Sequence, residues 1–256
     1  MTRAWLNGRL VDASAPALLV TEPGFTIGDG VFTTTVIEDG VPFALGRNLA
    51  RLIRHAGRLG LPVPDEAELR VGVRQLLDAA GVTSGRLRIA VTPTTLLVST
   101  APPLNYGPTS ITVTLPWQRN EHSPLTGVKS LSFGEASVAQ RYFRPLGADE
   151  GVLANTAGEV CEGVTSNLFV VLHGRLRTPP LASGCLDGVT REIVRERVQV
   201  DETPIPLASL GDVEAAFWAS ATRKVQPIGR LDGRVLTTTH PLIAEAAAAI
   251  AGYRED

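Results

Sequence analysis

The chain has 256 residues, of which 44% are hydrophobic and 20% are charged, and its formal net charge is −2. This length and apolar content allow one large hydrophobic core or two modest domains. Because there is neither a basic stripe nor an acidic tail, we expect neither nucleic acid nor a membrane surface as a partner.

The sequence shows neither a targeting segment nor a disulfide pattern. The first residues lack the apolar core of a signal peptide, and no apolar run approaches the roughly 18–20 residues that span a bilayer. Cys161 and Cys185 are too few for a disulfide framework, and a reduced cytoplasm fits them. The histidines lie apart and no Gly-x-Ser-x-Gly segment occurs, so the pattern predicts neither a metal centre nor a serine hydrolase.

A hairpin opens the chain, and two helices follow in its first half. Asn7-Gly8, between the segments Thr2–Leu6 and Arg9–Asp12, is the favoured pair for a type I′ turn. Apolar residues at helical spacing predict a helix over 47–60. A second helix is predicted over 65–81, with an aspartate as its N-cap and a glycine at its end.

A glycine-rich loop, 24–30, leads into a strand rich in β-branched residues, Val31–Val36. Alternation along this strand places Phe32 and Thr34 on one face. We interpret the glycines as a turn and not as a phosphate loop, because they precede a strand and not a helix. Further strands are predicted at 86–92, 96–100 and 110–117.

The polar, proline-bearing stretch 118–126 is the best domain boundary. It separates an N-terminal α/β domain, 1–117, from a C-terminal domain, 127–256. Strands and helices in both halves indicate an α+β or α/β fold. The helices predicted for the second half are 135–144, 189–198 and one from about 240, and its predicted strands are 151–155, 159–162, 167–172 and 214–220.

Lysine is rare in this sequence. Lys129 and Lys224 are the only two among 24 basic residues, and arginine supplies the rest. Arginine serves surface electrostatics as well as lysine does, but it cannot act as a neutral amine near neutral pH. We therefore interpret Lys129 as retained for amine chemistry. The alternative is a solvated surface lysine.

Three further segments complement an amine at Lys129. Glu162 is a carboxylate between small or apolar residues, and Gly188–Arg191 opens a helix, where backbone N–H groups favour an anion. Ser220-Ala221-Thr222 follows a strand and offers small residues for close backbone approach. Pyridoxal 5′-phosphate needs such a set: an amine for its aldehyde, an acid for its ring nitrogen and a cradle for its phosphate.

Seven segments of the chain, taken in order, resemble the class IV, branched-chain-aminotransferase-fold family of pyridoxal-phosphate enzymes. Each segment alone is weak, whereas seven in order along nearly the whole chain are specific. The resemblance implies a two-domain fold like that of D-amino-acid aminotransferase, known as fold type IV. The matching segments are Gly28–Phe32, Asn48–Leu52, Val128–Leu131, Gly147–Glu150, Glu162-Gly163 with Ser166–Phe169, Leu186–Arg191 and Val225–Ile228.

The resemblance also implies roles for single residues. Lys129 is expected to bond to the cofactor aldehyde, Glu162 to pair with the ring nitrogen, and Arg51 to bind the phosphate. On their own, Arg51 would be interpreted as a surface charge and Glu162 as a turn carboxylate. The rest of the expected phosphate cup is Val189, Thr190, Ser220 and Ala221, of which the last two could equally be ordinary strand-end residues.

Within this family the sequence is most similar to 4-amino-4-deoxychorismate lyase. Phe32-Thr33-Thr34 and Ala221 match that enzyme, and Phe133 stands near the place where branched-chain transaminases supply a tyrosine hydroxyl. The expected reaction releases pyruvate and 4-aminobenzoate, as in folate biosynthesis, with Lys129 as the proton acceptor and Thr34 as a possible proton donor. D-amino-acid or branched-chain aminotransfer, and a non-catalytic cofactor-binding protein, are the alternatives.

One segment departs from the family pattern. After the strand 86–92, relatives place arginine and glycine in a loop that binds the substrate carboxylate, whereas this chain has Pro93-Thr94-Thr95. The sequence therefore leaves the substrate carboxylate without an identified partner. The expected partners are a small-molecule amine substrate and a second copy of the chain in a homodimer.

Overall fold

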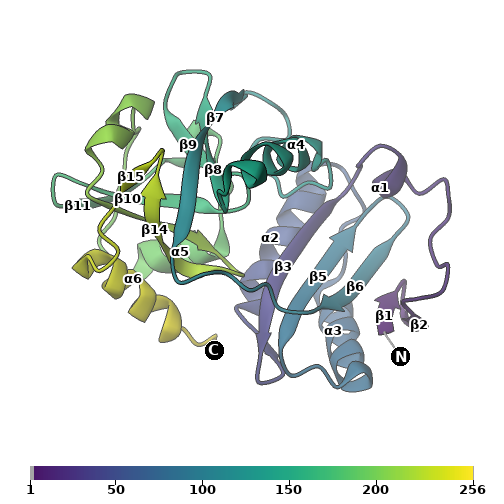
Figure 1. Cartoon of the computed structure of the whole chain (residues 1–256). Coiled ribbons are helices and arrows are strands. Elements are labelled where there is room, and N and C mark those ends of the chain that lie inside the picture. Colours follow the sequence, from purple (N-terminus) through teal and green to yellow (C-terminus); the bar gives the residue numbers. More distant parts are fainter. Residues whose placement is uncertain (1–2, 256) are drawn as a thin grey trace. The chain divides into compact units, whose positions relative to one another are not determined.

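A computed structural model describes residues 3–255, and Figure 1 shows its helices and strands. These residues form two compact units. Unit 1 consists of 3–105, Val128–Phe133 and 255, and unit 2 of Tyr106–Gly127 and Gly134–Arg254. Met1, Thr2 and Asp256, which the predicted hairpin and domains include, lie outside the described residues.

This division differs from the predicted one at 118–126. Strand β7 (Ser110–Arg119) belongs to unit 2, because it pairs with β8 (Glu150–Asn155) and β14 (Lys224–Leu231). Val128–Phe133 belongs to unit 1, because Ser130 forms a bridge with Val31. The segment that carries Lys129 thus packs with residues about a hundred positions earlier in the chain.

Unit 1 contains an antiparallel sheet. In the part of the chain that is described, its six strands run in the order β2 (Arg9–Asp12), β1 (Arg3–Leu6), β6 (Leu96–Ala101), β5 (Gly85–Val91), β3 (Val31–Glu38) and β4 (Val41–Pro42). The predicted hairpin between β1 and β2 is confirmed. Asn7 and Gly8 have φ of 46° and 87°, the positive values that a type I′ turn requires.

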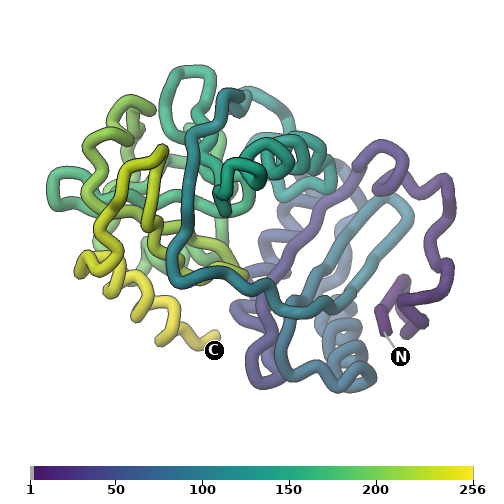
Figure 2. The backbone as a smooth tube through the Cα atoms, in the orientation of Figure 1, coloured from purple at the N-terminus to yellow at the C-terminus, as the bar shows by residue number. Residues whose placement is uncertain are grey.

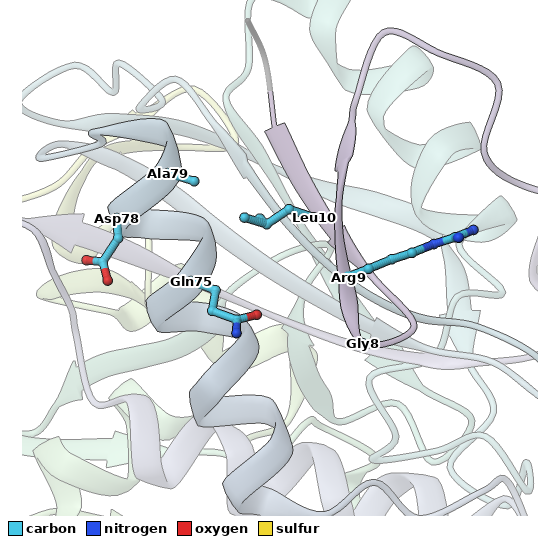
Figure 3. A pocket seen from close by; sticks show the side chains of 6 residues that line it. All are labelled: Gly8, Arg9, Leu10, Gln75, Asp78 and Ala79. Carbon is cyan, nitrogen blue, oxygen red and sulfur yellow. The ribbon is translucent and has the colours of Figure 1, made fainter.

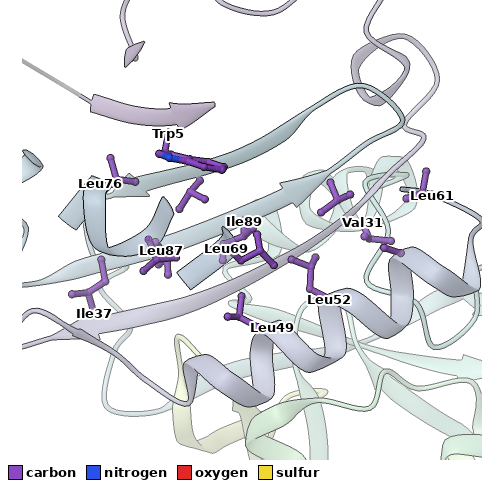
Figure 4. Packing of buried hydrophobic residues seen from close by; sticks show 14 residues of the cluster. Trp5, Val31, Ile37, Leu49, Leu52, Leu61, Leu69, Leu76, Leu87 and Ile89 are labelled. Atoms are coloured by element: carbon purple, nitrogen blue, oxygen red, sulfur yellow. The ribbon is translucent and has the colours of Figure 1, made fainter. Parts of the chain in front are cut away.

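Helices α2 (Leu45–Arg58) and α3 (Glu66–Ala80) cover one face of this sheet (Figure 1). Both were predicted. The Asp65 carboxylate accepts the N–H of Glu68 as the N-cap, and Gly81 ends α3 with a φ of 61°. Figure 4 shows the core between helices and strands, and its largest buried side chains include Trp5, Ile37, Leu49, Leu52, Leu69, Leu76, Leu87 and Ile89.

Alternation along β3 separates the two faces of the sheet. Val31 and Ile37 belong to the core under the helices, and Thr33 and Thr35 share their face. Phe32 and Thr34 point to the other face, as predicted. Before β3 the glycine-rich loop contains a short helix, α1 (Pro23–Thr26), which was not predicted. Figure 2 follows the long purple loop that leads from β2 to this helix.

Unit 2 contains a mixed sheet. Within the described residues its nine strands are ordered β12, β11, β10, β13, β14, β7, β8, β9, with β15 paired to β14. Strand β7 runs parallel to both of its neighbours. The short, charged strands β11 and β12 were not predicted, because β11 has a single apolar residue and β12 consists of two acidic residues. The remaining bounds are β9 (Val160–Gly163), β10 (Asn167–Leu172), β11 (Arg175–Thr178), β12 (Asp201–Glu202), β13 (Ala215–Ser220) and β15 (Arg234–Val235).

Three α-helices complete the described part of unit 2: α4 (Gly134–Phe143), α5 (Val189–Arg197) and α6 (Pro241–Ala251). All three were predicted to within a few residues. Helices α5 and α6 pack on each other and on β13, and α4 packs on β7 and β8. Across residues 3–255, no helix has the length and apolar character that crossing a membrane requires.

We predict opposite effects for two glycine-to-alanine changes in the helices of unit 1. A Cβ on Gly72 would lie 2.8–3.0 Å from three ring atoms of the buried Trp5, so Gly72→Ala should destabilise unit 1 by about 1–3 kcal/mol. A Cβ on Gly57 would come no closer than 3.7 Å to a neighbour, so Gly57→Ala should stabilise by about 0.5–1 kcal/mol through helix propensity. Urea unfolding of the two variants measures both, and equal shifts would contradict this account.

Candidate functional site

The Lys129 segment is joined to the start of strand β3. The carbonyl of Lys129 accepts the N–H of Phe32 at 2.9 Å, and the N–H of Leu131 donates to the carbonyl of Gly30 at 2.8 Å. Ser130 bridges Val31 between these two bonds. The segment therefore extends the antiparallel pairing of β3 by a few residues, and its backbone is fixed.

Two glycines permit this approach. A Cβ on Gly30 would lie 2.6 Å from the Leu131 side chain and 2.7 Å from the carbonyl oxygen of Val91. A Cβ on Gly28, whose φ is 70°, would lie 3.1 Å from the Cα of Ser132. The glycines before β3 thus serve a close contact between distant segments, which extends the sequence-based interpretation of a simple turn.

The Lys129 amine lies on the open face of the unit 1 sheet. Its Nζ is 4.7 Å from the centroid of the Phe32 ring, which supports a cation–π contact. Phe133 meets the same ring edge-to-face, with centroids 6.0 Å apart. The side chain of Lys129 is half-buried, so the interpretation as a fully solvated surface lysine does not hold.

Thr34 lies on the same face as Phe32 and is half-buried. The register pairs it with Arg88 of β5, and Arg88 in turn with Ser99 of β6. Directly paired residues point to the same side of an antiparallel sheet. A polar row therefore crosses the open face next to Phe32.

Arg51 of helix α2 is buried against strand β3, one helical turn from the His55 that contacts Lys129. Its Nη2 donates to the hydroxyl of Thr33 at 3.1 Å and to the side-chain oxygen of Asn48 at 3.2 Å. Only 5% of the residue is exposed. Arg51 is therefore not a surface charge. A guanidinium held in this way has a fixed direction, which suits the recognition of a phosphate.

His55, one helical turn after Arg51, holds the backbone of Lys129. Its Nδ1 accepts the N–H of Lys129 at 3.1 Å. Burial, followed by repulsion from Arg51 and other nearby cations, lowers the pKa of His55 to about 4. The imidazole is therefore neutral near pH 7 and can act as an acceptor at Nδ1.

In unit 2, Glu162 of β9 holds the loop before α5. One carboxylate oxygen accepts the N–H of Leu186 at 3.0 Å, and the other lies 3.5 Å from the Nη2 of Arg119. Asn167 donates to the carbonyl of the same residue, Leu186, at 2.8 Å. Both sides of Leu186 are thus held, and the side chain of Glu162 is mostly buried.

The other predicted residues of unit 2 gather around this loop. Asn167 pairs with Ala219 across β10 and β13, so the end of β13 lies beside the loop. There the Ser220 hydroxyl accepts the N–H of Arg223 at 3.1 Å and closes the turn that contains Ala221. Ser220 is thus already engaged by the protein.

The N-terminus of α5 has an unsatisfied hydroxyl. Thr190 is 2% exposed, and its Oγ1 has no hydrogen-bond partner within residues 3–255. The N-cap, Gly188, provides no side chain to cap the first turn of the helix. A buried donor that stays unpaired costs stability, so an acceptor from a ligand is expected here.

The chemistry of these side chains fits pyridoxal phosphate. Unit 1 offers the amine of Lys129 and the oriented guanidinium of Arg51. Unit 2 offers the carboxylate of Glu162, and an unpaired hydroxyl at a helix N-terminus, Thr190, where an anion is favoured. A surface pocket of about 650 Å³ elsewhere in unit 1 contains none of these residues, as Figure 3 shows, and is lined by Gly8, Arg9, Leu10, Gln75, Asp78 and Ala79.

Sequence reasoning missed three contributors to these surroundings. His55 follows Arg51 by four residues, a spacing that places both on one helix face and could have indicated it. Arg88 lies on a predicted strand. Alternation along the strand indicates on which face of the sheet Arg88 lies, but not which residues lie beside it. Arg119 had no signal in the sequence, because the pairing of strands brings it near Glu162.

We predict that the buried His55 makes unit 1 sensitive to acid. The unfolded chain protonates this histidine near pH 6.5 and the folded chain near pH 4, so stability falls as pH falls through that window, by up to about 3 kcal/mol. His55→Gln keeps an acceptor and should flatten the dependence measured by urea unfolding. The exposed His122 is the control, and a His122→Gln variant that flattened the curve equally would contradict the assignment.

We also predict that Thr190→Val weakens cofactor binding without lowering the stability of the protein. The loss of a charge-assisted hydrogen bond should weaken cofactor binding by about 10- to 100-fold, measured by quenching of tryptophan fluorescence. Without cofactor the melting temperature should stay equal or rise, because a buried unpaired hydroxyl is removed. Thr203→Val, at an exposed position, is the control. A lowered melting temperature with unchanged affinity would show that the hydroxyl is structural.

The chain resembles known proteins over most of its length. The amino-transferase class IV family matches residues 30–231. The chain is 27% identical to the D-alanine aminotransferase of Bacillus licheniformis, over 92% of this chain and 90% of that one.

Among solved structures, a fold IV transaminase from Curtobacterium pusillum is 28% identical and superposes with a TM-score of 0.88 over 99% of this chain and all of that one. A branched-chain aminotransferase from Thermoproteus uzoniensis is also 28% identical, with a TM-score of 0.89 over 98% of this chain and 93% of that one. The predicted mixed α/β fold of type IV is thereby confirmed.

The enzymes of the matched family use pyridoxal phosphate, so the predicted cofactor is confirmed as well. The match covers most of the chain and includes the segments of Lys129, Glu162 and Thr190. The chain belongs to the amino-transferase class IV family.

Proposed function

We propose that the chain is a pyridoxal-phosphate-dependent aminotransferase that takes the amine of an amino acid. The observation that carries the proposal is the position of Lys129 and of its amine. Its carbonyl accepts the N–H of Phe32 on β3, and its N–H donates to the Nδ1 of His55 on α2. Its amine lies on the open face beside Phe32. The related proteins described above are aminotransferases, which supports amino transfer over elimination.

In this proposal the residues of unit 1 bind and move protons. Lys129 would hold the cofactor through Nζ, and its free amine would accept the proton from the amine-bearing carbon of the substrate. His55 holds the backbone of Lys129, which limits the positions that the amine can reach. Arg51, oriented by Thr33 and Asn48, binds phosphate oxygens.

The residues of unit 2 orient the cofactor. Glu162 keeps a proton on the ring nitrogen, since a carboxylate beside that nitrogen favours its charged form. The Thr190 hydroxyl and the N–H groups at the start of α5, including that of Val189, bind the phosphate, and the turn at Ser220-Ala221 bounds it. When bound, pyridoxal phosphate supplies the electron sink that stabilises the carbanion of the substrate.

A second candidate is the elimination expected from the sequence, the 4-amino-4-deoxychorismate lyase reaction. One observation favours it. Thr34 is half-buried on the same face as Phe32, where its hydroxyl can donate a proton to a leaving fragment. The lyase needs no amino acceptor, so the two candidates differ in stoichiometry.

We predict that an amino acid offered without a 2-oxo acid acceptor reacts only once per bound cofactor. Cofactor-loaded protein mixed with D-alanine or L-leucine alone should release one equivalent of 2-oxo acid and then stop, because the amine remains on the cofactor. Addition of 2-oxoglutarate should restart it. The absorbance of the cofactor and the released 2-oxo acid are measured together. Catalytic release of pyruvate from aminodeoxychorismate without an acceptor would replace this proposal by the lyase.

We predict that borohydride fixes the cofactor on Lys129. Lys224 is the one other lysine of the sequence, so it is the only alternative side chain that needs a control variant. Mass spectrometry of digested protein should show the label on the Lys129 peptide, and Lys129→Ala should remove it and lower activity by at least about 100-fold. Lys224→Ala should keep both. A label on Lys224, or none, would overturn the assignment.

A further inference from the structure

A buried ion pair in unit 2 has no role yet in the proposed function. Arg223 follows the turn at Ser220-Ala221, and Glu150 is the first residue of strand β8. The Nη2 of Arg223 lies 3.5 Å from the Oε2 of Glu150, and the two side chains are 4% and 1% exposed. The removal of two charges from water is costly unless hydrogen bonds hold both partners. The contacts of each partner therefore show which segments the pair joins.

The guanidinium of Arg223 is held from several directions. It donates to the carbonyl of Asp149 at 2.9 Å and to the side-chain oxygen of Gln226, and its central carbon lies 4.3 Å from the centroid of the Tyr106 ring. The N–H of Arg223 donates to the hydroxyl of Ser220 at 3.1 Å. The side chain thus has a fixed orientation, and the backbone that closes the turn is fixed with it.

The carboxylate of Glu150 holds the loop 163–166. One of its oxygens accepts the N–H of Val164 at 3.1 Å. The other accepts the hydroxyls of Thr165 at 2.6 Å and Ser166 at 3.2 Å. Burial raises the pKa of Glu150, and the charge of its guanidinium partner is the largest influence against that shift. The acid therefore needs its cationic partner to keep the charge that binds the loop.

The loop 163–166 connects two residues that hold the start of α5. Glu162 precedes the loop and accepts the N–H of Leu186 at 3.0 Å, and Asn167 follows it and donates to the carbonyl of Leu186 at 2.8 Å. A displacement of the loop would move both contacts. Glu150 thus supports the acid proposed for the ring nitrogen, while its partner supports the turn proposed to bound the phosphate.

We propose that Arg223 is a positioning residue for the cofactor phosphate. It acts through the turn at Ser220, and its pairing with Glu150 fixes that turn relative to the loop 163–166. The inference rests on the proposed function. A lysine keeps the charge but lacks the planar fork, so it cannot meet a carboxylate, a carbonyl and an amide oxygen at the same time. The effect of Arg223 is selective for the phosphate, because the turn bounds that group and not the aldehyde.

The binding test compares pyridoxal 5′-phosphate with pyridoxal, which lacks the phosphate. Quenching of tryptophan fluorescence gives both dissociation constants. Arg223→Lys should raise the constant for pyridoxal 5′-phosphate by about 10-fold, the effect of one hydrogen bond to a charged group, and that for pyridoxal by less than about 2-fold. Arg234→Lys is the control. Arg234 also donates to two backbone carbonyls of unit 2, so its loss tests stability alone and should leave the ratio of the two constants unchanged.

The coupling test uses the full chain without cofactor. Hydrogen exchange of single amides is followed by NMR, with the amide of Phe169 in the buried strand β10 as the reference for global unfolding. Arg223→Lys should speed exchange of the Leu186 amide, which donates to Glu162, by about 3- to 10-fold relative to this reference. Glu150→Gln should speed exchange of the Arg223 amide by a similar factor.

Equal losses for pyridoxal 5′-phosphate and pyridoxal in Arg223→Lys would overturn the inference, since they indicate that the residue only supports the fold. Exchange of the Leu186 and Arg223 amides that follows the reference in both variants would overturn the coupling. A wild type that binds the two ligands equally, with both amides responding as expected, would instead contradict the phosphate site of the proposed function and leave the coupling standing.

Discussion

The position of Lys129 depends on the contact between its segment and the start of β3. Two backbone hydrogen bonds and one bridge join residues that lie about a hundred positions apart in the chain. Glycine at positions 28 and 30 favours this contact. A Cβ at position 30 would collide with Leu131 and with the carbonyl of Val91, and a Cβ at position 28, where φ is 70°, would crowd Ser132. The amine of Lys129 is then directed by the strand and not by a flexible loop.

A similar constraint acts in unit 2 at Leu186. Its N–H and its carbonyl are both held, by Glu162 and by Asn167, and Gly188 ends the loop at the start of α5. The residue that we propose for the cofactor ring therefore also positions the helix that we propose for the phosphate. Such coupling fixes two ligand contacts relative to each other with few side chains, which favours preorganisation.

The open face of the unit 1 sheet carries two cations beside one aromatic ring. Lys129 and Arg88 share the ring of Phe32, while the carboxylate of Glu22, which caps α1, accepts hydrogen bonds from threonine hydroxyls of the loop after β5. His55 stays neutral behind Lys129, because burial and neighbouring arginines oppose its protonation. Two cations thus lie against one aromatic ring, and the imidazole next to the lysine backbone adds no third charge.

The sequence by itself determined the local features. The Asn7-Gly8 turn and the Asp65 cap depend on the φ preferences and side-chain oxygens of a few neighbouring residues, so they could be predicted. The family, its fold and its cofactor followed from the order of seven segments, and they are confirmed. The roles assigned to Arg51, Lys129 and Glu162 stay predictions.

Only the tertiary structure decided which distant residues meet. It placed Lys129 with unit 1, buried Arg51 beside Thr33, and brought Arg88 to the ring of Phe32. It also formed the strands β11 and β12 from short charged segments, of which β11 has one apolar residue and β12 has none. The physical reason is that strand pairing and burial depend on partners far along the chain, whose identity no local pattern encodes.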